Sequence, residues 1–291
     1  MVDLLHAALI QPFAEFEFMR RALVGAVALA IAAAPVGVFL MLRRMSLTGD
    51  AMSHAILPGA AIGYLAAGLS LPAMTIGGLV AGIAVAVGAG AVARASVLGE
   101  DVALAAFYLV SLALGVTIVS MKGSNVDLLH VLFGTVLALD DQALFLIAGI
   151  ATATLFGFAV IFRPLVAESV DPVFLASVAR AGAPVHLVFM GLVVMNLVGA
   201  FHALGTLMAV GLMMLPAASA RLWVDDLSAM IGVAAGGGAL AAIVGLLASY
   251  HFGLPAGPAI ILTAGLVYVL SLAFGRRGLL VGRLMRPHLE A

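Results

Sequence analysis

The sequence predicts an all-α polytopic membrane protein, a class supported by its composition, by the length of its apolar runs and by the placement of its charges. Hydrophobic residues make up 65% of the chain, charged residues make up 9%, and the mean hydropathy is +1.26. A chain so poor in polar groups cannot cover a water-facing surface, and its apolar runs have the roughly 20-residue length that a bilayer core requires. The net charge of −1 gives no basic excess for nucleic acid, and the lack of cysteine excludes disulfides and thiolate metal ligands.

Nine apolar segments, each bounded by charges or by Gly and Pro, are predicted to cross the membrane as helices. They cover residues 22–42, 51–69, 72–93, 102–120, 142–162, 184–200, 203–220, 227–249 and 257–275. Residues 1–21 place acidic side chains ahead of their arginines, which indicates an interfacial helix and not a signal peptide. The apolar piece at 126–138 is too short to cross, so we expect it to lie on the outer surface. No segment suggests a soluble domain, and residues 1–291 are treated as one transmembrane domain.

The distribution of Lys and Arg orients these spans. With residues 22–42 running from outside to inside, three basic residues lie outside (Arg20, Arg21 and Lys122). The other ten of the 13 lie inside: Arg43, Arg44, Arg94, Arg163, Arg180, Arg221, Arg276, Arg277, Arg283 and Arg286. The positive-inside rule favours this orientation, which puts the N-terminus outside and the C-terminus in the cytoplasm.

The cytoplasmic loop at 163–183 has the signals of a short helix of its own. Ser169 or Asp171 can cap its start, Pro172 suits its first position, and Gly182 suits a left-handed stop. Such a helix could rest on lipid or could dock into a cytoplasmic partner. A partner is needed if ATP drives transport, because the chain has no phosphate-binding loop of the G-x-x-x-x-G-K-[ST] type.

Asp50 and His54 are the polar residues of greatest interest. They stand one helical turn apart on one face of an apolar segment, which Pro58 and Gly59 then interrupt. Ionisable groups inside a span usually face a cavity or a partner, and interrupted helices are typical of transport sites. Carboxylate and imidazole suit zinc or manganese, and a two-fold dimer would bring two such pairs together. The alternative is structural: Asp50 caps the helix start and His54 hydrogen-bonds a neighbour.

Three further histidines, His130, His202 and His251, fall near outer span ends in this topology. They could form an access path for a divalent cation, or each could be a satisfied interfacial group. A secondary carrier that uses Asp50 and His54 as a titrating pair is a different reading of the same residues. An intramembrane hydrolase using Ser53 or Ser70 is disfavoured, because neither serine sits in a Gly-flanked nucleophile elbow.

The stretch "RRMSLTGDAMSHAILPGAAIGYL" at 43–65 closely resembles the signature of permeases from the zinc/manganese/iron(II) family of ABC importers. Four later stretches resemble family segments in the same order and spacing, so the resemblance spans nearly the whole chain. They are "FGTVLALDDQAL" (133–144), "VDPVFLASVARAG" (170–182), "ALGTLMAVGLMMLPAASARL" (203–222) and "FGLPAGPAIILTAGLVYVLS" (252–271).

The resemblance implies a cobalamin-importer-like permease in the bacterial cytoplasmic membrane, embedded in lipid and working as a homodimer. It would receive metal from a periplasmic binding protein and be driven by two cytoplasmic ABC ATPase subunits, with zinc expected first, manganese second, and no permanently bound cofactor. Asp50 and His54 match the family's metal pathway. The loop helix becomes the ATPase-coupling helix, to which we assign Asp171, Pro172, Phe174, Arg180 and Gly182. His202 departs from the pattern, because many relatives have lysine or glutamine there.

Overall fold

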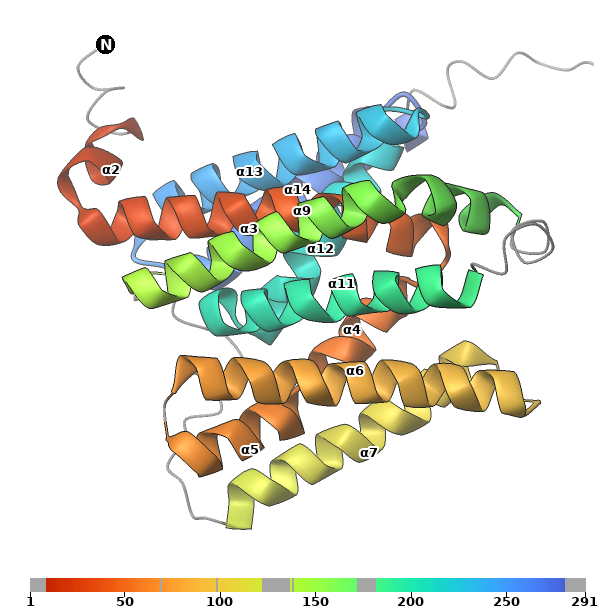
Figure 1. Cartoon of the computed structure of the whole chain (residues 1–291). Coiled ribbons are helices and arrows are strands. Elements are labelled where there is room, and N and C mark those ends of the chain that lie inside the picture. The colour runs from red at the N-terminus through yellow and green to blue at the C-terminus, as the bar shows by residue number, and fades with distance from the viewer. Residues whose placement is uncertain are drawn as a thin grey trace, which may run out of the picture.

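A computed structural model describes residues 9–68, 70–97, 99–121, 137, 139–171 and 182–280. These residues form helices and their connections, with no strand among them, so the all-α prediction is confirmed (Figure 1). The helices are α2 (Gln11–Glu15), α3 (Glu17–Leu42), α4 (Ser46–Ala55), α5 (Leu57–Ala67), α6 (Leu71–Ala95), α7 (Glu100–Met121), α9 (Asp141–Val170), α11 (Gly182–Leu204), α12 (Thr206–Arg221), α13 (Leu227–Phe252) and α14 (Ala256–Phe274).

Seven of the described helices are long and apolar enough to cross a membrane: α3, α6, α7, α9, α11, α13 and α14. The predicted span at 51–69 is built differently, from the end of α4 and the whole of α5, while α12 has 16 residues. The expected outer-surface piece at 126–138 falls almost entirely outside the described residues. Which face of the membrane each end meets stays a prediction.

Two boundaries differ from the sequence prediction. Helix α3 begins at Glu17, inside the stretch expected to be interfacial. The residue before it, Phe16, has an extended backbone and marks the start of the helix. Helix α9 does not end at residue 162 but passes Arg163 and Pro164 and reaches Val170. A proline inside a helix removes one hydrogen bond, which neighbouring helices can tolerate in a membrane bundle. Residues 163–170 are therefore helix, and the connection to α11 begins only at Asp171.

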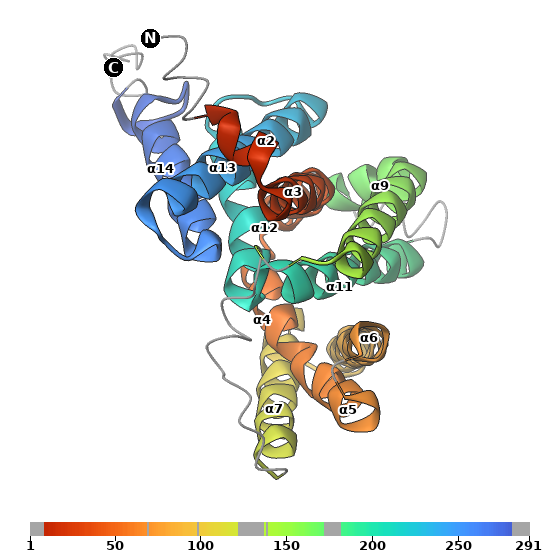
Figure 2. The same ribbon diagram turned by 90° about the vertical axis from the view of Figure 1, so that its left-hand side faces the viewer.

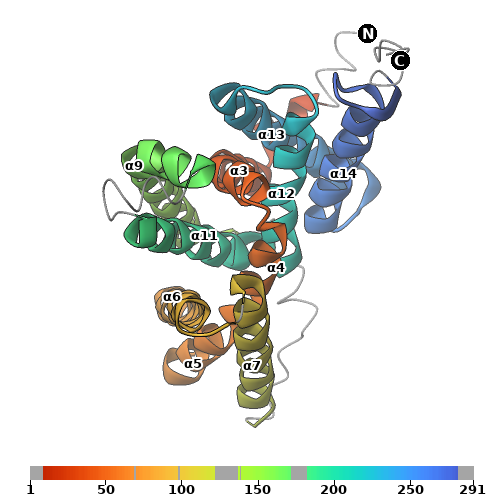
Figure 3. The same cartoon turned by 90° about the vertical axis from the view of Figure 1, so that its right-hand side faces the viewer.

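The helices form two groups, joined by α4. Viewed along α3, the helices α9, α11, α12 and α13 surround it, while α5, α6 and α7 form the second group (Figures 2 and 3). Close contacts depend on glycine: a Cβ at Gly37 would collide with the Met213 carbonyl, and one at Gly59 with the Gly77 carbonyl. Such small-residue approaches are how membrane helices pack. The groups meet where α4 contacts α7, α11 and α12 and where α6 packs directly against α11.

Candidate metal site

The predicted helix break after His54 is present. Helix α4 ends at Ala55, and Pro58 lies in the first turn of α5. Proline has no N–H and its ring excludes the carbonyl four residues earlier, which belongs to His54, so one continuous helix is disfavoured here. The hydroxyl of Ser111 on α7 donates to the carbonyl of the next residue, Ala55, at 3.0 Å. A side chain from another helix thus hydrogen-bonds the backbone at the break.

Asp50 lies within α4 and does not cap it. The helix starts at Ser46, with Met45 at the N-cap position, so the capping alternative for Asp50 is wrong. Its Oδ1 lies 3.9 Å from Nε2 of His54, and the two side chains are 65% and 28% exposed respectively. This separation is too long for a hydrogen bond but close enough for one cation to touch both groups.

His54 has an imidazole without a hydrogen-bond partner among the described residues. Its Nδ1 is buried and unpaired, and its ring stacks on Tyr108 of α7 with centroids 6.3 Å apart. Buried polar atoms are nearly always satisfied, so this exception requires an explanation. The structural alternative for His54, a hydrogen bond to a neighbour, has no support in the described part of the chain.

A cavity of about 290 Å³ adjoins Asp50 between α4 and α7. Its lining includes Ser46 and Thr48 of α4 and Asp101 and Tyr108 of α7, together with Arg44 and apolar side chains. Carboxylate, hydroxyl and imidazole groups are ligands for hard and borderline divalent cations. One protein copy does not complete such a site: the described residues contain no cluster of three or more His, Cys, Asp or Glu.

Of the other three candidate histidines, His251 is the one whose side chain is described, and it lies far from Asp50. His251 is in the last turn of α13 and lies edge-on to Tyr250, whose ring contacts Phe16 at the start of α3. Asp50 instead follows the far end of α3, a helix of 26 residues, or about 39 Å. His202 lies in α11, although its side chain is not among those described, and His130 is outside the described residues. The histidine access path stays a prediction.

The predicted coupling residues are only partly described. Asp171 follows α9 as its C-cap and is exposed, whereas Pro172, Phe174 and Arg180 lie outside the described residues. Two details of the loop prediction are wrong. Ser169 is inside α9 and donates its hydroxyl to the Leu165 carbonyl, so it caps no following helix. Gly182 opens α11 and is not left-handed, because the described left-handed glycines are Gly68, Gly205 and Gly253.

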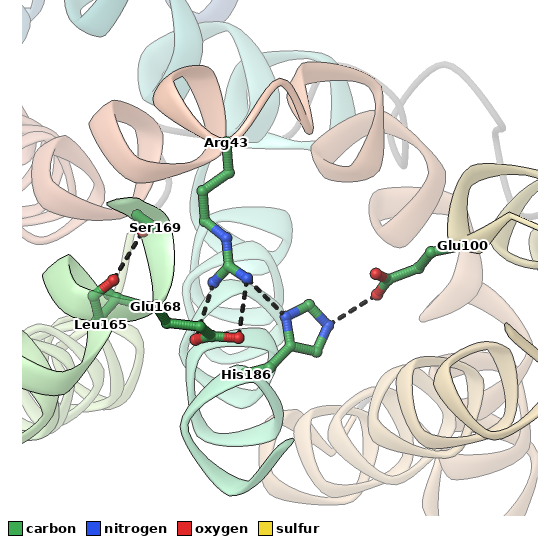
Figure 4. Close-up of polar contacts among 6 residues, drawn as sticks. All are labelled: Arg43, Glu100, Leu165, Glu168, Ser169 and His186. Carbon is green, nitrogen blue, oxygen red and sulfur yellow. Dashed lines mark hydrogen bonds and ion pairs between the residues drawn. The ribbon is translucent and has the colours of Figure 1, made fainter. Parts of the chain in front are cut away.

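The structure also contains a charged network that was not predicted from the sequence, formed by Arg43, Glu168, His186 and Glu100 (Figure 4). Both guanidinium Nη atoms of Arg43 donate to Glu168, at 3.1 and 3.4 Å, and Nη2 lies 3.1 Å from Nδ1 of His186. Since a guanidinium only donates, Nδ1 accepts, and Nε2–H of His186 donates to Glu100 at 2.7 Å. Arg43 and Glu168 are 13% and 8% exposed. The apolar residues after Pro164 continue the helix, and this pattern could have placed Glu168 within it.

Comparison with known proteins identifies the family. The model of the ABC 3 transport family matches residues 15–275. The manganese import system permease protein ScaB of Streptococcus parasanguinis is 35% identical over 257 residues, covering 88% of this chain and 90% of that protein. The manganese transport system membrane protein MntC of Listeria monocytogenes is 34% identical over 270 residues, covering 92% and 95%. The solved structure of PsaBC from Streptococcus pneumoniae in complex with Fab matches with a TM-score of 0.82 and 33% identity, covering 92% of this chain and 95% of that one. This chain therefore belongs to the ABC 3 transport family.

Proposed function

We propose that this chain is the membrane-spanning permease subunit of an ATP-driven importer and that its cargo is divalent manganese. The pairing of Asp50 with His54 at a helix break, with Asp50 on the wall of a cavity, is the observation that carries the proposal. The sequence alone places zinc first because histidines are numerous. Relatives similar over nearly the full chain, ScaB and MntC, are named for manganese, which supports reversing that order.

The chemistry of the pair suits this cargo. The Asp50 carboxylate would neutralise part of the charge of the ion, and Nε2 of His54, on the side of Asp50, can offer a nitrogen lone pair. Manganese accepts carboxylate and water oxygens readily and tolerates imidazole, while soft ions prefer the thiolates that this chain lacks. Two ligands bind weakly, which suits a transported ion. A two-fold homodimer would add a second Asp50–His54 pair and complete the shell.

The energy source is a separate subunit in this proposal. The chain has no phosphate-binding loop, so two cytoplasmic ABC ATPases would act on the segment between α9 and α11. A metal-binding protein would deliver the ion at the opposite face. Closure of the ATPase pair would then tilt the spans and expose Asp50 and His54 to each side of the membrane in turn.

The test is uptake of radioactive manganese into proteoliposomes that contain this chain with its ATPase and binding protein. We expect ATP-dependent accumulation, reduced at least about tenfold by His54→Ala or Asp50→Asn, since each removes a ligand. Asp141→Asn is the matched control, because Asp141 is an exposed carboxylate at the start of α9. Accumulation that needs an ion gradient and no ATP would overturn the proposal in favour of a secondary carrier. Accumulation of zinc alone would overturn the choice of metal.

A further inference from the structure

The four residues of the charged network belong to four helices and meet at one end of the bundle (Figure 4). Glu168 lies three residues before the C-cap of α9, and His186 lies in the second turn of α11, so the two flank the connection between these helices. Arg43 caps the end of α3, and Glu100 begins α7. We call these four residues the ionic junction.

We propose that the ionic junction positions α4 in the transport cycle: movement of the segment between α9 and α11 reaches Asp50 and His54 through Arg43 and Glu100. This inference rests on the proposed function, because it assumes that an ATPase acts on that segment. It assigns transport roles to side chains that touch neither metal nor nucleotide, so all four act as positioning residues.

Burial keeps the ionic junction together. Glu168 is 8% exposed, and Arg43 packs its guanidinium over the Phe189 ring, 5.4 Å from its centroid. Separating a buried carboxylate from the one cation that pairs with it in the described part of the chain leaves an uncompensated charge in a low-dielectric setting, which is strongly unfavourable. A shift of the α9 end therefore takes Arg43 with it, and the two helix ends move as one body.

The first route from the ionic junction runs through the chain itself. Only Arg44 and Met45 separate Arg43 from α4, and Arg44 is held in the left-handed region with φ 60°. The N–H of Met45 donates to the Leu40 carbonyl at 2.8 Å, which ties this turn to α3. Because the turn is short and is hydrogen-bonded to α3, it cannot absorb a displacement of Arg43 as a long, unbonded loop would. Motion of Arg43 therefore passes directly into α4.

The second route runs through α7. His186 donates to Glu100 in the first turn of α7, and the same helix carries Tyr108 and Ser111 further along. Tyr108 stacks on His54, and Ser111 holds the Ala55 carbonyl at the helix break. The start of α4 is thus connected to the ionic junction through Arg43, and its end is connected to it through Glu100 and α7. This convergence distinguishes the ionic junction from an ordinary buried ion pair.

The structure provides a matched control pair. Arg21 and Asp141 join the same two helices, α3 and α9, at their other ends, with Nη2 and Oδ1 3.0 Å apart. These side chains are 32% and 69% exposed, and neither leads to α4. The double variant Arg43→Gln/Glu168→Gln removes both buried charges and keeps amide groups that can bond each other. Arg21→Gln/Asp141→Asn likewise replaces both charged groups of the control pair with amides.

The first readout is manganese transported per ATP hydrolysed by the reconstituted complex. We expect Arg43→Gln/Glu168→Gln to lower this ratio about tenfold while the complex assembles and hydrolyses ATP, the size typical of coupling between sites. The control pair should leave the ratio unchanged. An unchanged ratio in the Arg43/Glu168 variant, or loss of assembly with uptake and hydrolysis falling together, would make the network merely structural and overturn the inference.

The second readout follows α4 directly. The chain has no cysteine, so Ser46→Cys places a single thiol on the cavity wall at the start of α4. Its modification rate by a water-soluble maleimide should change with ATP in the otherwise unaltered complex and in the control variant, but not in the Arg43/Glu168 variant. The same nucleotide response in all three would refute the inference. Absence of ATP-driven uptake by the unaltered complex would instead refute the proposed function.

Discussion

Replacing Arg43 with methionine would leave Glu168 as a buried carboxylate with no cation beside it. Glu168 is 8% exposed and receives both hydrogen bonds of the Arg43 fork. Removing one partner of such a pair costs about 3–5 kcal/mol, because the remaining charge stays desolvated. His186 bonds Arg43 and Glu100 and makes no described hydrogen bond to Glu168. We therefore expect a loss of stability of that size in detergent-purified protein.

The assay is thermal unfolding of the purified chain, with two comparisons that separate burial from charge. Arg21→Met breaks two ion pairs, to Asp141 of α9 and to Glu17 of α3, and both carboxylates are exposed, where such pairs are worth about 0–1 kcal/mol each. Arg43→Met/Glu168→Leu removes both charges and should recover most of the stability, since apolar replacement of a buried pair is often neutral. Equal losses for Arg43→Met and Arg21→Met would refute the reasoning, as would failure of the double variant to recover.

Two further substitutions test the packing around the site by the same assay. Ser111→Ala removes the donor to the Ala55 carbonyl and should cost about 1–3 kcal/mol, whereas Thr117→Ala, in the same helix but exposed and bonded only within it, should be nearly silent. Gly59→Ala would drive a methyl group into the Gly77 carbonyl and should prevent α5 and α6 from closing, while Gly265→Ala meets open space and should stabilise α14 slightly. Stability unchanged by Ser111→Ala or Gly59→Ala would contradict the described contacts.

Local patterns predicted the helices well because the length and hydropathy of a segment are enough to identify a membrane span. Seven of the nine predicted segments correspond to described helices long enough to cross a membrane, while 51–69 is divided between α4 and α5 and 203–220 corresponds to the 16-residue α12. The break at Pro58 follows from the missing N–H of proline. The family resemblance built on residues 43–65 is confirmed by the family match over 15–275. The Asp50–His54 pair was found because i and i+4 share a helix face, which is information local to the chain.

The errors arose where tertiary contacts decide. Arg163 and Pro164 look like the end of a span, yet Leu165 is fully buried and Glu168 is paired, so packing extends α9 past both. Arg43 and Glu168 are 125 residues apart in sequence. No periodicity links positions so distant. His186 likewise looks like a solitary polar residue at the start of an apolar run, and only the fold shows its two partners.

The most direct test of the account is whether manganese bound to the assembled complex is ligated by His54. Electron spin echo spectroscopy of bound Mn²⁺ detects coupling to a ligating imidazole nitrogen. The account predicts that this coupling is present in the unaltered complex, is lost in His54→Ala and survives in His251→Ala, because His251 lies beyond the opposite end of α3. Nitrogen coupling that persisted in His54→Ala would place the metal elsewhere and contradict the central claim.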